Sequence, residues 1–328
     1  MADSINVLVL FGPTAVGKTS VAEELFTGDG ARRAEIVSAD SMQVYKGMDI
    51  GTAKPSASLR ERLPHHLIDI RMPDQSYNAG DFVHLAKETI ARIAERGALP
   101  VVSGGTGFYL KNLIMGLPEA PPSDEGVRRA LKAELREQGA ETLGRELAAC
   151  DPVSAARIHI NDEYRLLRAL EVFRLTGKPL SAFSMNAARA GDPRASRPEF
   201  SGNRRDKYRF LTLALERPRE DLYQRINDRC ALMFKNGLAE EVRSLADSGY
   251  GPLCPGMKAI GYREFFDERG YAGGAAIEAL VAQHSRNYAK RQMTYFASIP
   301  NTVWIRADEK PVEKIKALLN APLPDAWL

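Results

Sequence analysis

Short runs of apolar residues recur along the chain, and most are followed by a polar turn and then by apolar positions with helical spacing. This alternation is typical of βα units that build a parallel sheet flanked by helices. It predicts strands at Asn6–Phe11, Glu35–Ala39, His66–Ile70, Leu99–Ser103, Tyr208–Leu215 and Thr302–Ile305. We therefore expect an α/β fold with its ligand beyond the carboxyl ends of the strands.

The stretch from 118 to 205 breaks this alternation. Two helical patterns occupy it, at Val127–Cys150 and Glu163–Thr176, and Gly177-Lys178-Pro179 ends the second. Further helices are predicted at Arg219–Lys235, Leu238–Asp247 and Ala275–Ala297. We expect residues 1–117 and 206–328 to form the sheet domain, and residues 118–205 to form a helical insertion.

A glycine-containing loop directly follows the first predicted strand. It reads Gly12, Pro13, Thr14, Ala15, Val16, Gly17, Lys18 and Thr19, and a helical pattern comes next. In this setting successive backbone N–H groups converge on anionic oxygens, a lysine adds positive charge, and a threonine hydroxyl can ligate Mg²⁺. Such turns can also serve packing alone. The strand before the loop and the helix after it favour a P-loop NTPase-like fold that binds a diphosphate or triphosphate.

Bulk composition narrows the protein class without choosing a reaction. The 328 residues are 44% hydrophobic and 27% charged, and the net charge of +3 permits a polyanionic partner without requiring one. The three cysteines, Cys150, Cys230 and Cys254, lie far apart, which argues against a disulfide scaffold or zinc site and fits a reducing cytoplasm. We expect a cytoplasmic monomer with no signal peptide and no membrane partner.

Two further strand ends carry groups suited to chemistry. Asp40 follows the second predicted strand, where its carboxylate could act as a general base or could simply cap a turn. Thr106 stands in the turn Gly104-Gly105-Thr106-Gly107 after the fourth strand. Its hydroxyl could bind a second side of the phosphates, although turn chemistry alone also explains the glycines. Position on the ligand-binding edge favours function for Thr106 and leaves both roles open for Asp40.

Arg225 and Arg229 are four residues apart on a predicted helix and therefore share one face. They flank an apolar stripe of Leu222, Ile226, Cys230 and Met233. Two guanidinium groups so placed could reach a leaving pyrophosphate from the side opposite Lys18. The alternative is a solvated pair of arginines bonded to Asp221 or Asp228, and without further context this alternative is favoured.

Basic residues interleave with aromatic residues at several places. These groups are Arg286, Lys290 and Arg291 with Tyr288 and Tyr295; Lys258 and Arg263 with Tyr262; and Arg165 with Arg168. Each group alone is typical of a solvated helix face, but together they make a polyanion such as RNA a plausible partner.

Taken in order, several segments resemble the tRNA dimethylallyltransferase family, whose members prenylate an adenosine beside the anticodon. The resemblance runs from about Val7 to Arg306 and includes the loop at 12–19. Its other pieces are Ser-Ala-Asp-Ser-Met-Gln-Val-Tyr at 38–45, Asp-Ile-Gly-Thr-Ala-Lys-Pro at 49–55, Pro-His-His-Leu-Ile-Asp at 64–69, Gly-Gly-Thr-Gly-Phe-Tyr at 104–109, Arg-Ala-Leu-Glu-Val-Phe at 168–173, Lys-Ala-Ile-Gly-Tyr-Arg at 258–263 and Lys-Arg-Gln-Met-Thr at 290–294. A phosphate loop alone is common, whereas this ordered set is specific.

The resemblance implies roles for the matching residues. The loop from Gly12 to Thr19 would hold the diphosphate of dimethylallyl diphosphate, with Mg²⁺ on Thr19. Asp40 would take the proton of the adenine N6 amine, Thr106 would contact the reacting groups, and Arg225 or Arg229 would contact the leaving pyrophosphate. Contact with the tRNA anticodon stem-loop is implied for Asp40, Ser41, Met42, Gln43, Arg128, Tyr164, Arg165, Arg168, Lys258, Gly261, Tyr262, Arg263, Lys290, Arg291 and Gln292.

Two positions depart from the family pattern. Ala297 stands where an arginine is common after Lys-Arg-Gln, so one phosphate contact would be missing or moved. Val16 replaces a small residue before the second glycine of the loop, and we expect its side chain to point away from the ligand.

Three other functions compete with this interpretation. A small-molecule P-loop kinase would leave the insertion and the segments 258–263 and 290–294 unexplained. An adenylate prenyltransferase would modify free AMP, whereas the insertion and the basic groups favour tRNA. A non-catalytic RNA-binding protein regulated by a nucleotide is the third alternative.

Overall fold

The structure is a computed structural model that describes residues 4–117, 120–183, 207–267, 270–271 and 276–320. Its contacts divide the chain into a sheet unit, residues 1–115 with 202–328, and a helical unit, residues 116–201. The domain boundaries expected from the sequence, at 117/118 and 205/206, border segments that lie outside the described residues.

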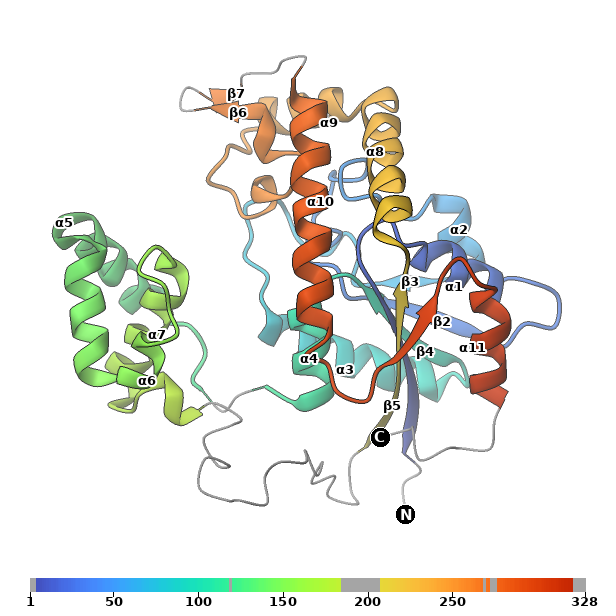
Figure 1. The fold of residues 1–328 in the computed structure, drawn as a ribbon, viewed down its shortest axis with the longest axis horizontal. Coiled ribbons are helices and arrows are strands. Elements are labelled where there is room, and N and C mark those ends of the chain that lie inside the picture. Colours follow the sequence, from blue (N-terminus) through green and yellow to red (C-terminus); the bar gives the residue numbers. More distant parts are fainter. Residues whose placement is uncertain (1–3, 118–119, 184–206, 268–269, 272–275, 321–328) are drawn as a thin grey trace. The chain divides into compact units, whose positions relative to one another are not determined.

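The sheet unit is built on six parallel strands in the order β3-β2-β4-β1-β5-β8 (Figure 1). The strands are β1 (Ile5–Phe11), β2 (Ala34–Ser38), β3 (His65–His66), β4 (Leu99–Gly104), β5 (Tyr208–Glu216) and β8 (Val303–Arg306). The helices of this unit are α1 (Lys18–Phe26), α2 (Ala57–Arg62), α3 (Ala79–Glu95), α4 (Gly107–Met115), α8 (Arg219–Lys235), α9 (Leu238–Asp247), α10 (Ile277–Phe296) and α11 (Pro311–Asn320). Short 3₁₀ turns at Gly256–Lys258 and Arg263–Phe265 and a small hairpin of β6 (Phe266–Asp267) and β7 (Gly270–Tyr271) complete it. The parallel α/β sheet flanked by helices that the sequence predicted is confirmed.

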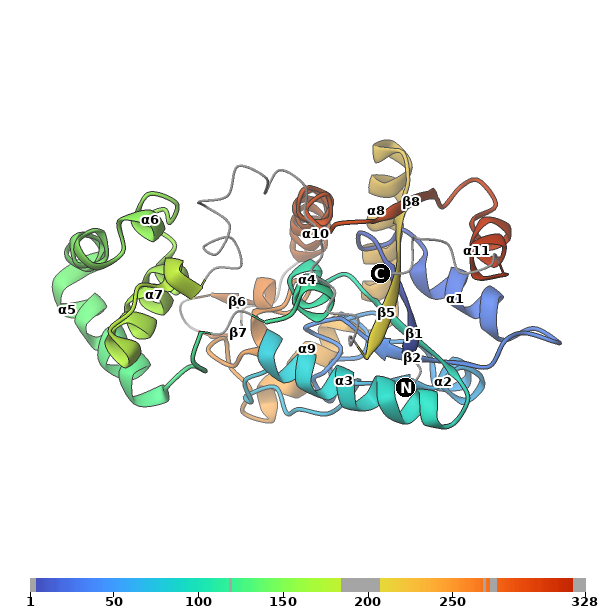
Figure 2. The same cartoon turned by 90° about the horizontal axis from the view of Figure 1, so that it is seen from below.

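Both faces of the sheet are buried, which explains why β1 reads as a continuous apolar run. Leu8 and Leu10 face a core shared with α1, α8 and α11, whereas Val7, Val9 and Phe11 face a second core built largely by α3 and α4. Figure 2 shows α3 and α4 on one side of the strands and α1 and α11 on the other. Burial of each such side chain stabilises the fold by about 1.5–3 kcal/mol relative to leaving it exposed.

The strand register brings the carboxyl ends of β1, β2 and β4 to one level. Phe11 at the end of β1 pairs with Gly104 at the end of β4, and Ser38 at the end of β2 pairs with Ser103. The segments that leave these ends are therefore neighbours, although they are far apart in the sequence.

One predicted strand is wrong in extent. The apolar pattern indicated a strand at His66–Ile70, but β3 covers only His65–His66. The chain leaves the sheet at Leu67, whose φ of 62° is left-handed, and Asp69 has a φ of 57°. Neither backbone conformation is compatible with an extended strand.

The helical unit contains α5 (Glu125–Cys150), α6 (Pro152–Ala155), α7 (Glu163–Thr176) and a 3₁₀ turn at Leu180–Phe183. It has its own apolar core, to which α5 contributes Leu131, Leu143 and Leu147. Gly139, with φ 78° and ψ 163°, interrupts α5, so the single predicted helix is two helical segments joined at a kink.

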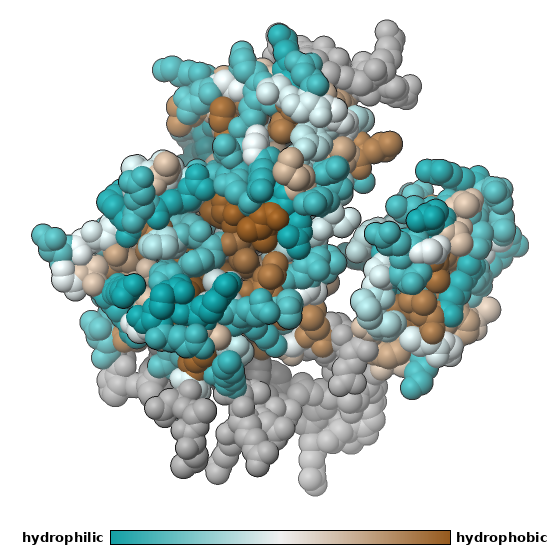
Figure 3. Space-filling view, turned by 180° about the vertical axis from the view of Figure 1, so that it is seen from behind, coloured by the Kyte–Doolittle hydropathy of each residue, from teal (hydrophilic) through white to brown (hydrophobic). Residues whose placement is uncertain are grey.

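The surface is mainly hydrophilic, with smaller hydrophobic patches on both units (Figure 3). Within the described residues, no helix has the length and apolar character needed to cross a membrane.

Among the glycines that the structure describes, Gly104 leaves the least room for a side chain. A Cβ atom added there would lie 2.2 Å from the backbone oxygen of Ala39, which cannot move without displacing the end of β2. We expect Gly104→Ala to destabilise the sheet unit by about 1–3 kcal/mol and to lower its thermal unfolding midpoint by several degrees in calorimetry. Gly28→Ala is the matched control, because nothing lies within 4 Å of its added Cβ; equal midpoints for the two variants would contradict the steric argument.

Candidate active site

The loop from Gly12 to Thr19 connects the buried end of β1 to the first turn of α1. Gly17 caps α1 in a left-handed conformation with φ 110°, and Ala15 has a φ of 64°. Val16 is 0% exposed and belongs to the core beneath the loop, so its side chain is directed into the protein. The helix start thus presents free N–H groups and the positive end of its dipole to this edge of the sheet.

Lys18 supplies positive charge at the loop. Its Nζ atom donates hydrogen bonds to the backbone oxygens of Gly12 and Pro13, each at 2.9 Å. Burial lowers the pKa of Lys18 to about 8; the nearby Asp40 carboxylate opposes this effect and Arg229 adds to it. An anion that binds beside Lys18 would therefore stabilise its charged form.

Arginines from the β5–α8 region surround the same loop. Arg225 donates from Nε to Ala15 O (2.9 Å), and Arg229 donates from Nη2 to the Thr14 hydroxyl (2.5 Å). Arg217 donates from Nε to Val16 O (2.9 Å). Burial lowers the pKa of Arg229, a sign that its charge is poorly solvated in the absence of an anion.

This arrangement decides between the two interpretations of the arginine pair. Asp221 pairs with Arg217 at 2.9 Å, and Asp228 accepts a hydrogen bond from Gln224 at 2.7 Å. Arg225 and Arg229 instead bond to the loop at 12–19, so neither forms the expected pair with Asp221 or Asp228, although Arg225 itself is exposed.

Asp40 follows β2 and forms a turn with its own backbone. Its Oδ1 atom accepts hydrogen bonds from the N–H groups of Met42 (2.9 Å) and Gln43 (3.3 Å). The turn role considered from the sequence is therefore present. It also orients the carboxylate, because one oxygen is held by two donors while the charge lies close enough to Lys18 to affect the pKa of that lysine.

Thr106 lies against the Asp40 segment. Its N–H donates to Ala39 O (3.1 Å), and its hydroxyl accepts from Ser41 N–H (3.0 Å). The structure therefore brings together the loop at 12–19, the Asp40 turn, Thr106 and the two arginines, which the sequence had placed on separate strand ends and a helix.

Gln292 on α10 joins two of these segments. Its side-chain oxygen accepts from Thr14 N–H (2.9 Å), and its side-chain nitrogen donates to Gly105 O (2.7 Å). The residue is only 5% exposed. The amide of Gln292, for which the resemblance implied a tRNA contact, is thus buried and bonded on both sides.

Tyr262, for which a tRNA contact was also implied, is buried as well. Its ring is 0% exposed, and its hydroxyl donates to Glu241 at 2.6 Å. The same carboxylate accepts from the N–H groups of Asp49 (2.8 Å), Ile50 (2.8 Å) and Gly51 (3.2 Å). Tyr262 and Glu241 thus position the loop at 49–51.

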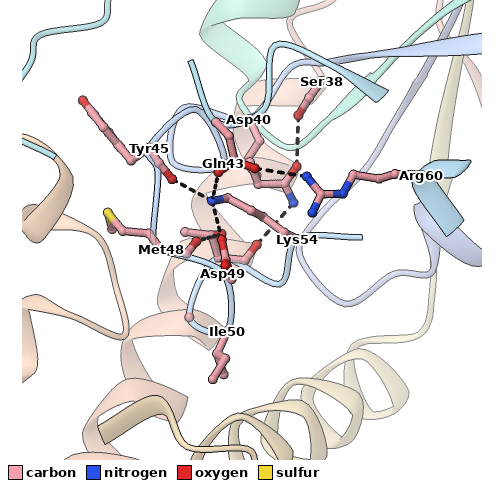
Figure 4. Close-up of polar contacts among 12 residues, drawn as sticks. Ser38, Asp40, Gln43, Tyr45, Met48, Asp49, Ile50, Lys54 and Arg60 are labelled. Atoms are coloured by element: carbon pink, nitrogen blue, oxygen red, sulfur yellow. Dashed lines mark hydrogen bonds and ion pairs between the residues drawn. The ribbon is translucent and has the colours of Figure 1, made fainter. Parts of the chain in front are cut away.

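Lys54 also holds this loop (Figure 4). Its side chain is 2% exposed, and its Nζ atom contacts Asp49 at 2.6 Å, Asp69 at 2.5 Å and the Tyr45 backbone oxygen at 2.7 Å. Gln43 donates from Nε2 to the oxygens of Thr52 and Ala53, both at 3.3 Å. The segment after Asp40 is therefore held by the buried side chain of Lys54 and the half-buried Gln43.

A cavity of about 410 Å³ opens between this loop and α8. Ile50, Leu232 and Met233 form apolar parts of its wall, and Lys54 and Arg229 contribute charged parts. Since Arg229 also bonds to Thr14, it borders both the cavity and the phosphate loop.

The remaining residues expected to contact tRNA lie at the surface or in the helical unit. In the sheet unit Lys258, Arg263, Lys290 and Arg291 are exposed, whereas Gly261 is buried. In the helical unit the Arg128 guanidinium stacks at 4.5 Å on the ring of Tyr164, which is 66% exposed, and Arg165 is exposed. Arg168 bonds at 2.8 Å to the fully buried Glu171, so part of its charge serves the fold of that unit.

Sequence reasoning missed the site roles of Arg217, Glu241 and Tyr288. Arg217 could have been found, because it directly follows β5 at the same edge of the sheet. Tyr288 lies one helical turn before Gln292; burial raises its pKa to about 12, Asp40 adds to this effect, and hydrogen bonds to Thr106 and Gln292 oppose it. Glu241 left no signal, since the three N–H groups that it accepts from are about 190 residues away.

The fold and the loop define an α/β protein in which a carboxylate and a threonine lie at the same sheet edge as a glycine-containing loop contacted by cations. A family model described as IPP transferase matches residues 43–299. The tRNA dimethylallyltransferase of Geobacter metallireducens is 44% identical over 306 residues, which cover 92% of this chain and 93% of that protein.

Solved structures agree with this comparison. The tRNA isopentenylpyrophosphate transferase of Bacillus halodurans has a TM-score of 0.63 and 35% identity, and the match covers 97% of this chain and 95% of that one. A eukaryotic dimethylallyltransferase with 24% identity and a TM-score of 0.72, matched over 97% of this chain and 79% of that one, shares the fold. The chain therefore belongs to the IPP transferase family.

The lowered pKa of Lys18 predicts a pH dependence of diphosphate binding. As the pH rises through about 8, Lys18 of the free protein loses its proton, so affinity for dimethylallyl diphosphate should fall between pH 7 and 9. The ligand itself is not the cause, because phosphate esters lose their last proton near pH 6, below this range. The measurement is calorimetric titration across this range.

Lys18→Arg is the control, since a guanidinium stays charged throughout the range. Its affinity should be flat with pH, whatever its absolute value. A flat profile for the unaltered protein would show that Lys18 does not titrate at the site.

Proposed function

We propose that this protein is a tRNA dimethylallyltransferase. It transfers the dimethylallyl group of dimethylallyl diphosphate to N6 of the adenosine beside the tRNA anticodon and releases diphosphate. The observation that carries the proposal is the meeting of a cation-lined phosphate loop with Asp40 and Thr106 at one sheet edge, in a chain of the IPP transferase family.

The phosphate loop holds the leaving group in this proposal. Negative charge builds on the diphosphate as the allylic C–O bond weakens, and Lys18, Arg225 and Arg229 already surround the loop. Fixed donors of this kind stabilise the developing charge more than they stabilise the bound donor.

Thr19 is the proposed protein ligand for Mg²⁺. It is exposed in the first turn of α1, beside Lys18, which fits an ion that keeps several waters and bridges substrate phosphates with few protein ligands. Among the described residues, no group of three or more His, Cys, Asp or Glu side chains is arranged to hold a metal. When bound there with the donor, the ion would neutralise part of the diphosphate charge.

Asp40 is the proposed general base. The adenine N6 forms a bond to the allylic carbon, the C–O bond to diphosphate breaks, and the N6 proton passes to the Asp40 carboxylate. Because Met42 and Gln43 hold Oδ1, the carboxylate is oriented before substrate arrives. Thr106, bonded to Ser41 on the same segment, is proposed to contact the reacting groups.

Basic and aromatic residues near the surface are the proposed contacts to the anticodon stem-loop. They are the half-buried Arg128 with the exposed Tyr164 and Arg165 in the helical unit, and the exposed Lys258, Arg263, Lys290 and Arg291 in the sheet unit. Their charge suits the RNA backbone, and an adenosine modified at N6 must leave its stack to reach a site at the sheet edge. The monomeric state and the cytoplasmic location stay predictions from the sequence.

The direct test combines purified protein, Mg²⁺, dimethylallyl diphosphate and unmodified tRNA, followed by nucleoside digestion and mass spectrometry. We expect one adenosine to gain a dimethylallyl group only when both substrates are present. Equal modification of free AMP would instead support an adenylate prenyltransferase, and ADP formed from ATP with a small alcohol would support a kinase.

Asp40→Asn tests the base. The amide keeps an oxygen for the Met42 N–H but cannot take a proton, so kcat should fall about 10²–10⁴-fold in single-turnover assays. Affinity for tRNA, measured by filter binding, should change little. This outcome also separates an enzyme from a non-catalytic RNA-binding protein. Asp74→Asn, at an exposed position, is the control and should keep normal turnover.

A further inference from the structure

Gln292 occupies an unusual position for a polar residue on a long helix. It is 5% exposed, lies in the last two turns of α10, and bonds to two loops that are 278 and 187 residues away in the sequence. One of these loops holds the proposed leaving group, and the other contains Thr106.

The orientation of the Gln292 amide is determined by its partners. Thr14 offers a backbone N–H, which can only donate, and Gly105 offers a backbone carbonyl, which can only accept. The fit is tight on the Gly105 side, where a Cβ atom would lie 2.5 Å from Gln292 Nε2. Neither loop can shift alone without leaving a buried polar group unpaired, which is costly.

Hydrogen bonds and short backbone links connect Gln292 to the proposed base. Gly105 is followed by Thr106, whose hydroxyl accepts from Ser41 N–H at 3.0 Å, and Ser41 directly follows Asp40. On the other side, the Thr14 hydroxyl accepts from Arg229. A contiguous path therefore runs from the arginine beside the diphosphate loop to the carboxylate.

The face of α10 that carries Gln292 is fixed against the Thr106 turn. Tyr295, one turn further along, lies so close to Gly107 that an added Cβ would be 2.5 Å from its ring. The helix thus acts as a rigid support from which the Gln292 amide reaches both loops.

We propose that Gln292 is a positioning residue that couples the two substrate sites, so that an occupied diphosphate loop increases the affinity for RNA at the Asp40 and Thr106 side, and the reverse. This inference rests on the proposed roles of the two loops. Coupling of this kind is reciprocal: each ligand must change the affinity of the other by the same factor.

The experiment measures this factor. Binding of a fluorescently labelled, unmodified anticodon stem-loop RNA is followed by anisotropy at a constant Mg²⁺ concentration. The titration is done with and without saturating inorganic pyrophosphate. For the unaltered protein we expect pyrophosphate to tighten RNA binding at least about 5-fold. For Gln292→Met, which keeps the side-chain length but removes both hydrogen bonds, the factor should fall to less than about 2-fold.

Gln292→Glu is the second variant, in case the methionine variant does not fold. It keeps an acceptor for Thr14 N–H but loses the donor to Gly105 O, so the factor should fall in the same way. Gln283→Met is the matched control, because Gln283 is exposed on the same helix, and it should keep the full factor.

Two results would overturn the inference. One is an unaltered protein with no coupling between pyrophosphate and RNA. The other is a Gln292 variant whose separate affinities drop while the factor stays unchanged, since that is the behaviour of a purely structural residue. The same preparations are assayed for prenyl transfer; transfer without coupling rejects this inference alone, whereas no transfer by the unaltered protein rejects the proposed function.

Discussion

Parallel pairing of β1, β2 and β4 brings three strand ends to one level, and the site depends on this alignment. The loop at 12–19 follows β1, the Asp40 segment follows β2, and the Thr106 turn follows β4. Because Phe11 pairs with Gly104 and Ser38 with Ser103, a slip of one register position in either pairing would separate these groups by about 3.3 Å along the sheet. Both faces of these strands are closely packed, so a slip of β1 would move Leu8 and Leu10 into the core now filled by Val7, Val9 and Phe11, and the reverse.

The strand ends alone do not fix the loops. Buried and half-buried polar side chains also hold them in place. Gln292 joins the phosphate loop to the Thr106 turn, Glu241 gathers the N–H groups at 49–51, and Lys54 connects that loop to Asp69. The buried side chains of Gln292 and Lys54 are tolerated because their hydrogen bonds are made, and Glu241 is half-buried. A site held in this way is oriented before substrate binds. Polar groups that are fixed in advance stabilise transition-state charge most effectively, because they need not reorganise during the reaction.

Cationic side chains also hold the loop at 12–19 in place. In the ligand-free protein Arg225 and Arg229 bond to the loop itself, and Lys18 bonds to its carbonyl oxygens. Burial lowers the pKa values of Lys18 and Arg229, so these charges are incompletely satisfied until an anion is present.

By itself, the sequence determined the α/β class, the phosphate loop and the strand ends at Asp40 and Thr106, because apolar periodicity and glycine spacing act over a few residues. Only the tertiary structure decided the use of Arg225 and Arg229 at the loop, the early end of β3 at His66, and the buried roles of Gln292 and Tyr262. A basic or aromatic motif does not reveal whether its polar atoms meet solvent or a backbone group some 200 residues away. That choice depends on which helix face packs against which loop, and packing is a property of the whole fold.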